Sequence, residues 1–334
     1  MSDFDKKAIP DKLNRLYKAG LLSEKYFYII TTFFNCYSQN HFDADSFELF
    51  NTFIDLMQKQ LKEPFLFEAF HEKIQKPFNY YEFGYRFIEP LVDLAKSSLG
   101  KEENIIEIQK ILIRQENVLL LANHQTESDP QLISLILNKA GHPNLAADII
   151  YIAGERVTTD PLAIPFSMGC NLLCIYSKKH IDTDPLQKEK KQLHNQKTMQ
   201  KLCALLSEGG KIVFAAPSGG RDRKNAQGQV EIAPFNPQSI EMLYLMAKKA
   251  TRSSHFFPLT LSTYDILPPP PVVEKQLGEE RIARRSLVHI YFGDEIDMQK
   301  YPGSDAPDKK IKRQNRANYI WSLVNDAYQK INRE

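Results

Sequence analysis

The sequence has few cysteines and no excess of charge of one sign. Its four cysteines, at positions 36, 170, 174 and 203, are too few and too irregularly spaced for a disulfide framework or a paired zinc site. They are predicted to be reduced thiols in the core. Lys and Arg total 43 against 41 Asp and Glu, a net charge of +2, so the chain lacks the basic field that indicates a nucleic-acid partner.

Long apolar runs are missing as well. A membrane span needs about 18 continuous apolar residues, and stretches such as Val118 to Ala122 are only a few residues long. The amino-terminal segment MSDFDKKAIPDKL has neither the apolar core of a signal peptide nor the acid-poor composition of a transit peptide. A soluble, cytoplasmic protein without a transmembrane segment is expected, and transient contact with a membrane surface stays open. No cofactor or metal site is expected, because the histidines lack ligand partners at recognisable spacing.

What the sequence does contain is enough apolar material for a large core, with 43% hydrophobic and 11% aromatic residues in 334 positions. The chain is expected to divide into two domains. Residues 1–75 are predicted to form a small helical bundle, since apolar residues recur at helical spacing from Ile9 to about Gln75, with Asp11 and Ser23 as helix caps. The bundle is expected to pack against the larger domain or to form part of a dock for a partner.

Residues 76–334 are predicted to form an α/β domain with a largely buried mixed sheet covered by helices. Short apolar strands alternate there with longer helical stretches. The expected strands are 118–122, 149–153, 172–176, 212–216, 256–261 and 287–292. The expected helices are 130–139, 185–207, 237–250 and 308–330.

A histidine and an aspartate follow the first of the buried strands. His124 stands just past the strand end, where the loops of α/β sheets place ligands, and its side chain titrates near neutrality, which suits a general base. Asp129 could accept the other ring N–H if a turn separates the two residues. A loop histidine beside an ordinary helix cap is the alternative.

The dipeptide Asp-Pro recurs in the chain. Asp129-Pro130, Asp160-Pro161 and Asp184-Pro185 each match a favoured helix start, with Asp as N-cap and Pro at the first helical position. For Asp160 and Asp184 this interpretation needs no further function.

Four segments carry a family resemblance. They are NHQTESDP from Asn123, the stretch AGERVTTDPLAIPFSMGCNLLCIYSKKHIDTDP, AAPSGGRDR, and PLTLSTYDILPPPPVVEKQLGEERI. In this order and spacing, through roughly residue 295, the sequence resembles the soluble glycerol-3-phosphate 1-acyltransferases of plant plastids and chlamydia-like bacteria, within the glycerolipid acyltransferase superfamily. The resemblance implies transfer of an acyl group from an acyl-carrier-protein or coenzyme A thioester to the sn-1 hydroxyl of glycerol 3-phosphate, giving lysophosphatidate for phospholipid synthesis.

The resemblance also implies residue roles. His124 would be the general base and Asp129 would orient it, without a covalent acyl-enzyme. The phosphate would lie on Lys179, His180, Arg221 and Arg223. Both cation pairs follow predicted strands, and Arg221 and Arg223 are two residues apart, so in an extended loop they would face the same side and could fork onto phosphate oxygens. Solvated loop charges are the alternative.

One position departs from the family pattern. The family commonly has Met-Gly-Arg-Asn where this chain has Met168-Gly169-Cys170-Asn171, which bears on affinity or donor preference. Cys170 is predicted to be a packed thiol. Two basic clusters are candidate docks for the acidic donor, although charge runs are usually solvated helix faces. These are Arg281, Arg284 and Arg285, and Lys309, Lys310, Lys312, Arg313 and Arg316.

Two other functions stay open from the sequence. A lysophosphatidate acyltransferase could share the His/Asp pair, but such enzymes usually carry membrane-embedding apolar segments. A non-catalytic module that binds phosphate esters or phospholipids could keep the cationic loops, although it would have no need of both His124 and Asp129.

Overall fold

A mixed β-sheet forms the centre of the protein. The computed structural model describes residues 3–39, 42–176, 181, 185–270 and 277–333. Within them the sheet has eight strands in the order β1-β5-β4-β6-β3-β9-β10-β2. The strands β7 and β8 form a separate two-stranded sheet. The strands of the large sheet are β1 Phe70–His71, β2 Ser98–Gly100, β3 Asn117–Ala122, β4 Ile149–Gly154, β5 Asn171–Ile175, β6 Ile212–Ala215, β9 Ser254–Ser262 and β10 His289–Phe292.

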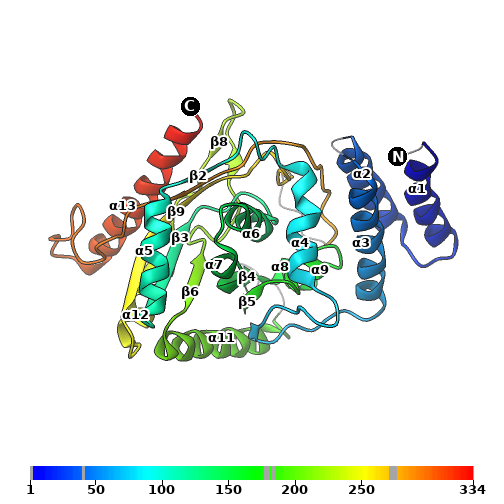
Figure 1. The fold of residues 1–334 in the computed structure, drawn as a ribbon. Coiled ribbons are helices and arrows are strands. Elements are labelled where there is room, and N and C mark those ends of the chain that lie inside the picture. Colours follow the sequence, from blue (N-terminus) through cyan, green and yellow to red (C-terminus); the bar gives the residue numbers. More distant parts are fainter. Residues whose placement is uncertain (1–2, 40–41, 177–180, 182–184, 271–276, 334) are drawn as a thin grey trace.

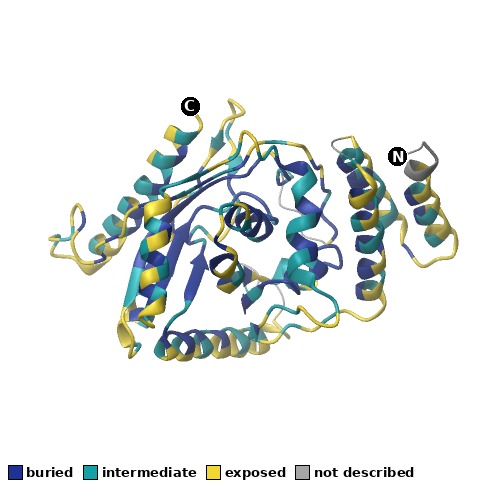
Figure 2. Cartoon of the chain, viewed as in Figure 1, coloured by how far each residue is buried: buried dark blue, intermediate teal, exposed yellow. Residues whose placement is uncertain are grey.

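The sheet is buried on both faces, as Figure 2 shows by the dark strands. Side chains alternate between the faces of a strand, so in β3 Val118 and Leu120 join one hydrophobic cluster while Leu119 and Leu121 join another. The second cluster is completed by α11 Lys188–Glu208, α12 Pro237–Lys249 and α13 Lys309–Ile331. The first is completed by α5 Glu102–Ile113, α6 Asp129–Lys139, α7 Pro143–Asp148 and the amino-terminal helices. The predicted α/β class with covering helices is confirmed.

Three amino-terminal helices lie on the side of the molecule away from α13 (Figure 1). They are α1 Asp3–Lys18, α2 Glu24–Ser38 and α3 Ala44–Lys62. Ser23 caps α2 as expected. Two details of the prediction are wrong: Asp11 lies inside α1, and the helical region ends at Lys62, since residues 63–79 hold only irregular backbone and β1. Pro64 cannot continue the ladder of helical hydrogen bonds, which explains the early stop.

An aromatic cluster joins these helices to the rest of the chain. Phe53 of α3 stacks on Phe166 of α9 Ile164–Ser167 at 5.6 Å between ring centroids. Phe87, in α4 Tyr80–Ile88, lies 5.1 Å from the same ring, and its carbonyl oxygen accepts a hydrogen bond from the Tyr37 hydroxyl at 2.7 Å. The division at residue 75 stays a prediction. The strand β1 lies before this position and yet pairs with β5 of the central sheet.

Four neighbouring strands end at one edge of the sheet. β5, β4, β6 and β3 are adjacent and mutually parallel, so the loops that follow their carboxyl ends lie side by side. After β6, the chain forms the two-residue strands β7 Arg223–Lys224 and β8 Val230–Glu231. This edge therefore receives the loop after β3 with His124, the short helix α8 Glu155–Thr159 after β4, and the Arg221–Arg223 segment after β6.

No helix among the described residues is long and apolar enough to cross a membrane.

Candidate active site

His124 and Asp129 are in direct contact. The ring Nδ1 of His124 lies 2.7 Å from Oδ2 of Asp129, and the histidine side chain is 31% exposed whereas the aspartate is 1% exposed. Because an ionised carboxylate only accepts, Nδ1 carries the ring proton and Nε2 keeps a lone pair. The expected turn brings the two together: α6 starts at Asp129, five positions after the histidine. The pair thus has the geometry of an oriented general base.

The Asp129 carboxylate is fixed by donors from two parts of the chain. Oδ2 accepts from the backbone N–H of Gln125 at 2.9 Å, and both oxygens lie 3.3 Å from the N–H of Thr126. Oδ1 accepts from the Thr263 hydroxyl at 2.7 Å. Asp129 is the first residue of α6 and Ser128 is its N-cap, so the predicted capping role of Asp129 is wrong. Its carboxylate closes the preceding turn and holds the imidazole.

Asp222 connects the histidine loop to the cationic loop. Its backbone N–H donates to the carbonyl oxygen of His124 at 2.7 Å, and its carboxylate accepts from Asn123 at 3.0 Å, from Gln125 at 3.3 Å and from the Ala233 N–H at 2.9 Å. Burial raises the pKa of Asp222 to about 6, while these donors act against that rise. The two residues on either side of Asp222 are Arg221 and Arg223, which are therefore held beside His124.

Arg221 and Arg223 have different surroundings. Nη2 of Arg221 contacts both carboxylate oxygens of Glu279, at 2.5 and 2.7 Å. The Nη1 of Arg223 is buried and has no hydrogen-bond partner among the described residues. Burial and the charge of Arg221 both lower the pKa of Arg223. A buried donor without a partner is costly, so this guanidinium is suited to bind an anion.

Lys179 and His180, the other two predicted phosphate ligands, lie outside the described residues, as does Asp184. The strand before them, β5, ends at Ile175 at the same edge of the sheet as β4, β6 and β3.

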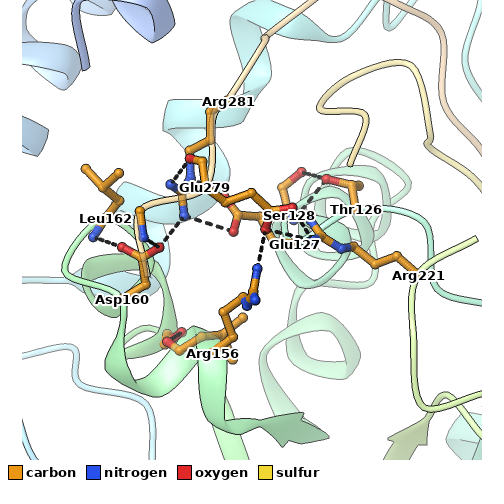
Figure 3. A network of polar contacts seen from close by, with 12 residues as sticks. Thr126, Glu127, Ser128, Arg156, Asp160, Leu162, Arg221, Glu279 and Arg281 are labelled. Atoms are coloured by element: carbon orange, nitrogen blue, oxygen red, sulfur yellow. Dashed lines mark hydrogen bonds and ion pairs between the residues drawn. The ribbon is translucent and has the colours of Figure 1, made fainter. Parts of the chain in front are cut away.

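The first candidate dock contains a buried residue. Arg281 is 5% exposed and pairs with Glu127, at 2.5 and 3.0 Å, and with Asp160 at 3.3 Å (Figure 3). Arg281 therefore cannot be part of an exposed dock, although Arg284 and Arg285 are exposed. The predicted N-cap role of Asp160 is wrong, because Asp160 follows the last residue of α8 as its C-cap and the next helix, α9, has Ala163 as its N-cap. Asp160 is 1% exposed and accepts from the Leu162 N–H at 3.0 Å besides the arginine.

In the second candidate dock, Arg313 and Arg316 are paired with Glu241, at 3.3 and 2.6 Å, while Lys309 and Lys310 are exposed. Cys170 is a packed thiol, as predicted. It is 8% exposed, burial raises its pKa to about 12, and its sulfur lies 3.5 Å from the side-chain nitrogen of Gln131.

Several residues of the site were missed from the sequence. Arg156 follows the end of β4, so the strand-end argument used for the other cations would have found it. Glu279 and Thr263 gave no signal, because Thr263 is 134 residues from the carboxylate that it contacts. Asp222 was overlooked because it lies between two arginines and resembles an ordinary acidic residue in a loop.

No group of three or more His, Cys, Asp or Glu side chains among the described residues could hold a metal ion. The chemistry that this geometry supports is proton transfer by an imidazole next to a cationic site.

Comparison with known proteins gives the family. The Acyltransferase family profile matches residues 101–262. Three proteins named glycerol-3-phosphate acyltransferase, chloroplastic, are similar to most of the chain. The relative from Spinacia oleracea is 38% identical over 290 residues, which are 86% of this chain and 61% of the relative. The relative from Arabidopsis thaliana is 35% identical over 83% of this chain and 60% of its own length, and that from Pisum sativum is 41% identical over 78% and 57%.

The chain spans about 60% of the length of these relatives. Among solved structures, a 1-acyl-sn-glycerophosphate acyltransferase from Thermotoga maritima matches 99% of this chain and 98% of its own, with a TM-score of 0.42 and 14% identity, which is too distant to bear on function. The curated relatives and the family profile agree with one another. The chain belongs to the acyltransferase family, in the group of the plastid-type glycerol-3-phosphate acyltransferases.

Proposed function

We propose that the protein transfers a fatty acyl group from a thioester of acyl carrier protein or coenzyme A to the sn-1 hydroxyl of glycerol 3-phosphate. The product is 1-acyl-sn-glycerol 3-phosphate, and the thiol of the carrier is released. The observation that carries the proposal is the 2.7 Å contact between His124 and Asp129, with the Arg221–Arg223 segment bonded to the carbonyl of the same histidine. The curated relatives bear the name of this activity.

His124 and Asp129 act as a proton-transfer pair in this proposal. Nε2 takes the proton of the attacking hydroxyl while its oxygen bonds to the thioester carbonyl carbon. The tetrahedral intermediate then collapses, the carbon–sulfur bond breaks, and the imidazolium supplies the proton for the leaving thiolate. The Asp129 carboxylate stabilises the imidazolium at 2.7 Å. A positioned base contributes about 10²- to 10⁴-fold to the rate.

The arginines hold the other end of the acceptor. Arg221 and Arg223, with Lys179 and His180, bind the phosphate and bring the hydroxyl to the imidazole. Holding both reactants in register can contribute more to the rate than the base does. The acceptor hydroxyl is itself the nucleophile, so neither Ser128 nor a cysteine has to form an acyl-enzyme.

The test is an acylation assay with glycerol 3-phosphate, lysophosphatidate and glycerol as acceptors, each with matched carrier-protein and coenzyme A thioesters. Preferred acylation of glycerol 3-phosphate at the sn-1 position supports the proposal. Preference for lysophosphatidate, or binding of glycerol 3-phosphate without turnover, contradicts it. The same assay identifies the donor.

A further inference from the structure

A buried carboxylate lies between two arginines at the candidate phosphate site. Glu279 is 3% exposed, and its oxygens contact Nη2 of Arg221 at 2.5 and 2.7 Å and Nη1 of Arg156 at 3.2 Å. Figure 3 shows the two guanidinium groups reaching Glu279 from different elements, Arg156 from α8 and Arg221 from the loop after β6. A buried ion pair of this kind has to be well made to offset the loss of hydration.

The segment around Glu279 is itself tied to the site. The carbonyl oxygen of Glu279 accepts from Nη1 of Arg281 at 2.9 Å, and the neighbouring Gly278 donates its N–H to Asp160 at 3.2 Å. Arg281 in turn holds Glu127, which lies in the turn between His124 and Asp129. The Glu279 carboxylate is therefore placed by the same network that shapes the catalytic loop.

The contact leaves most donors of Arg221 available. Only Nη2 is used by Glu279, and no other hydrogen bond of Arg221 is found within the part of the chain that the structure describes. A guanidinium has five N–H donors in a rigid plane, so fixing Nη2 orients the remaining edge without covering it. Arg223, with its unpaired Nη1, is close enough for the charges of Arg221 and Arg156 to lower its pKa and for Glu279 to raise it.

The charges in this cluster suit an anion. Among the described residues, three guanidinium groups, Arg156, Arg221 and Arg223, lie around the single carboxylate of Glu279, so positive charge is in excess around that carboxylate. Without the carboxylate, three like charges would repel one another and the arginine side chains would turn outward to water.

We infer that Glu279 is a positioning residue for phosphate recognition, which holds Arg221 so that its remaining N–H groups and the guanidinium of Arg223 converge on the phosphate of the acceptor. Arg156, held by the same carboxylate, adds a third positive charge beside this site. The inference rests on the proposed function, because it assigns the occupant of the site as the phosphate of glycerol 3-phosphate. A carboxylate that instead competed with the phosphate would have the opposite effect on affinity.

The experiment compares Glu279→Gln with Glu280→Gln. Glu280 is the neighbouring acid, is only partly buried, and has no ion pair to another described residue, so it controls for loss of one negative charge. For Glu279→Gln the KM for glycerol 3-phosphate should rise about tenfold or more while kcat changes less than about threefold, because the phosphate binds alike in the ground and transition states. Calorimetric titration of glycerol 3-phosphate without donor should show the same loss. Glu279→Asp, which keeps the charge, should recover part of it.

Glycerol provides a second control, since it lacks the phosphate. Wild type and Glu279→Gln should acylate glycerol at the same slow rate. An unchanged or lower KM for glycerol 3-phosphate in Glu279→Gln would overturn the inference, as would a loss of kcat alone. If this variant does not fold, the KM for glycerol 3-phosphate is measured for Arg156→Met and Glu279→Asp instead. A wild-type KM in both variants would overturn the inference. A wild-type enzyme that does not acylate glycerol 3-phosphate would instead overturn the proposed function.

Discussion

The backbone N–H of Asp222 donates to the carbonyl oxygen of His124 at 2.7 Å, which fastens the cationic loop to the catalytic loop. A main-chain hydrogen bond thus fixes the position of Arg221 and Arg223, on either side of Asp222, relative to the histidine loop. The Asp222 carboxylate adds three further hydrogen bonds in the same region. This contact couples acceptor binding to proton transfer in the proposed mechanism.

Replacing His124 by Ala is expected to lower kcat/KM by about 10²- to 10⁴-fold, because the general base is lost. The affinity for glycerol 3-phosphate, measured by calorimetry, should stay within about threefold, since the phosphate cations are untouched. His255→Ala is the control. His255 pairs with Glu116 and Glu295 at the amino-terminal end of β9, the opposite edge of the sheet, and its loss should leave turnover unchanged. Near-normal turnover by the His124 variant would refute the base assignment.

Replacing Thr263 by Val should destabilise the protein by about 1.5–3 kcal/mol, because the hydroxyl bonds to a charged, buried carboxylate. Thr260→Val offers a matched comparison. Thr260 is equally buried, but its hydroxyl donates to the neutral carbonyl oxygen of Val324 at 3.3 Å, so about 0.5–1.5 kcal/mol should be lost. Urea denaturation of both variants measures the difference. Equal losses would show that Thr263 does not stabilise a charge on Asp129.

Asp222 should make stability depend on pH between the ordinary pKa of an aspartate, 3.8, and its folded pKa of about 6. In that window the folded protein holds a proton that the unfolded chain has released, so the free energy of unfolding falls as pH rises and levels off above the folded pKa. The difference corresponds to about 3 kcal/mol. Asp222→Asn cannot titrate, so the gap between wild type and variant, measured by urea denaturation from pH 3 to 7, should change by about this amount. A constant gap would argue against a raised pKa.

Cys170 should be dispensable for turnover. Its thiol is buried with a pKa of about 12 and is no nucleophile at neutral pH. Cys170→Ala is expected to keep kcat within about twofold of wild type. Alkylation of the folded protein, followed by peptide mass spectrometry, should label the half-buried Cys36 and Cys203 before the buried Cys170 and Cys174. Rapid labelling of Cys170 would contradict this interpretation.

The longer strands of the α/β part and the helices α6, α11, α12 and α13 were predictable because they are encoded locally, whereas α4, α5 and α7 were not expected. Continuous apolar runs such as Val118 to Ala122 are too short for a helix and predict a strand covered on both faces. The two-residue strand β1 could not be predicted, since Phe70 and His71 carry no alternation and owe their pairing to β5. The same holds for residues 63–75, where apolar side chains continue at helical spacing beyond the stop at Pro64.

The site was predictable where it follows strand ends and not where it depends on distant partners. His124, Arg221 and Arg223 all stand shortly after a buried strand. The network of Arg281 with Glu127 and Asp160 joins segments 121 and 154 residues apart, so spacing could not indicate it, and an arginine in a basic run resembles a surface charge. The burial of Arg281 follows only from the path of the chain near residue 278.

The contact of Phe53 with Phe166 limits how the protein can be shortened. A fragment that starts at residue 76 would lose β1 from the sheet edge and would expose the side of Phe166 that Phe53 covers. Such a fragment should aggregate and accumulate in inclusion bodies. Because Tyr37 of α2 also bonds to the carbonyl oxygen of Phe87, shortened versions of the protein, including fusions to a purification tag, should begin upstream of α2.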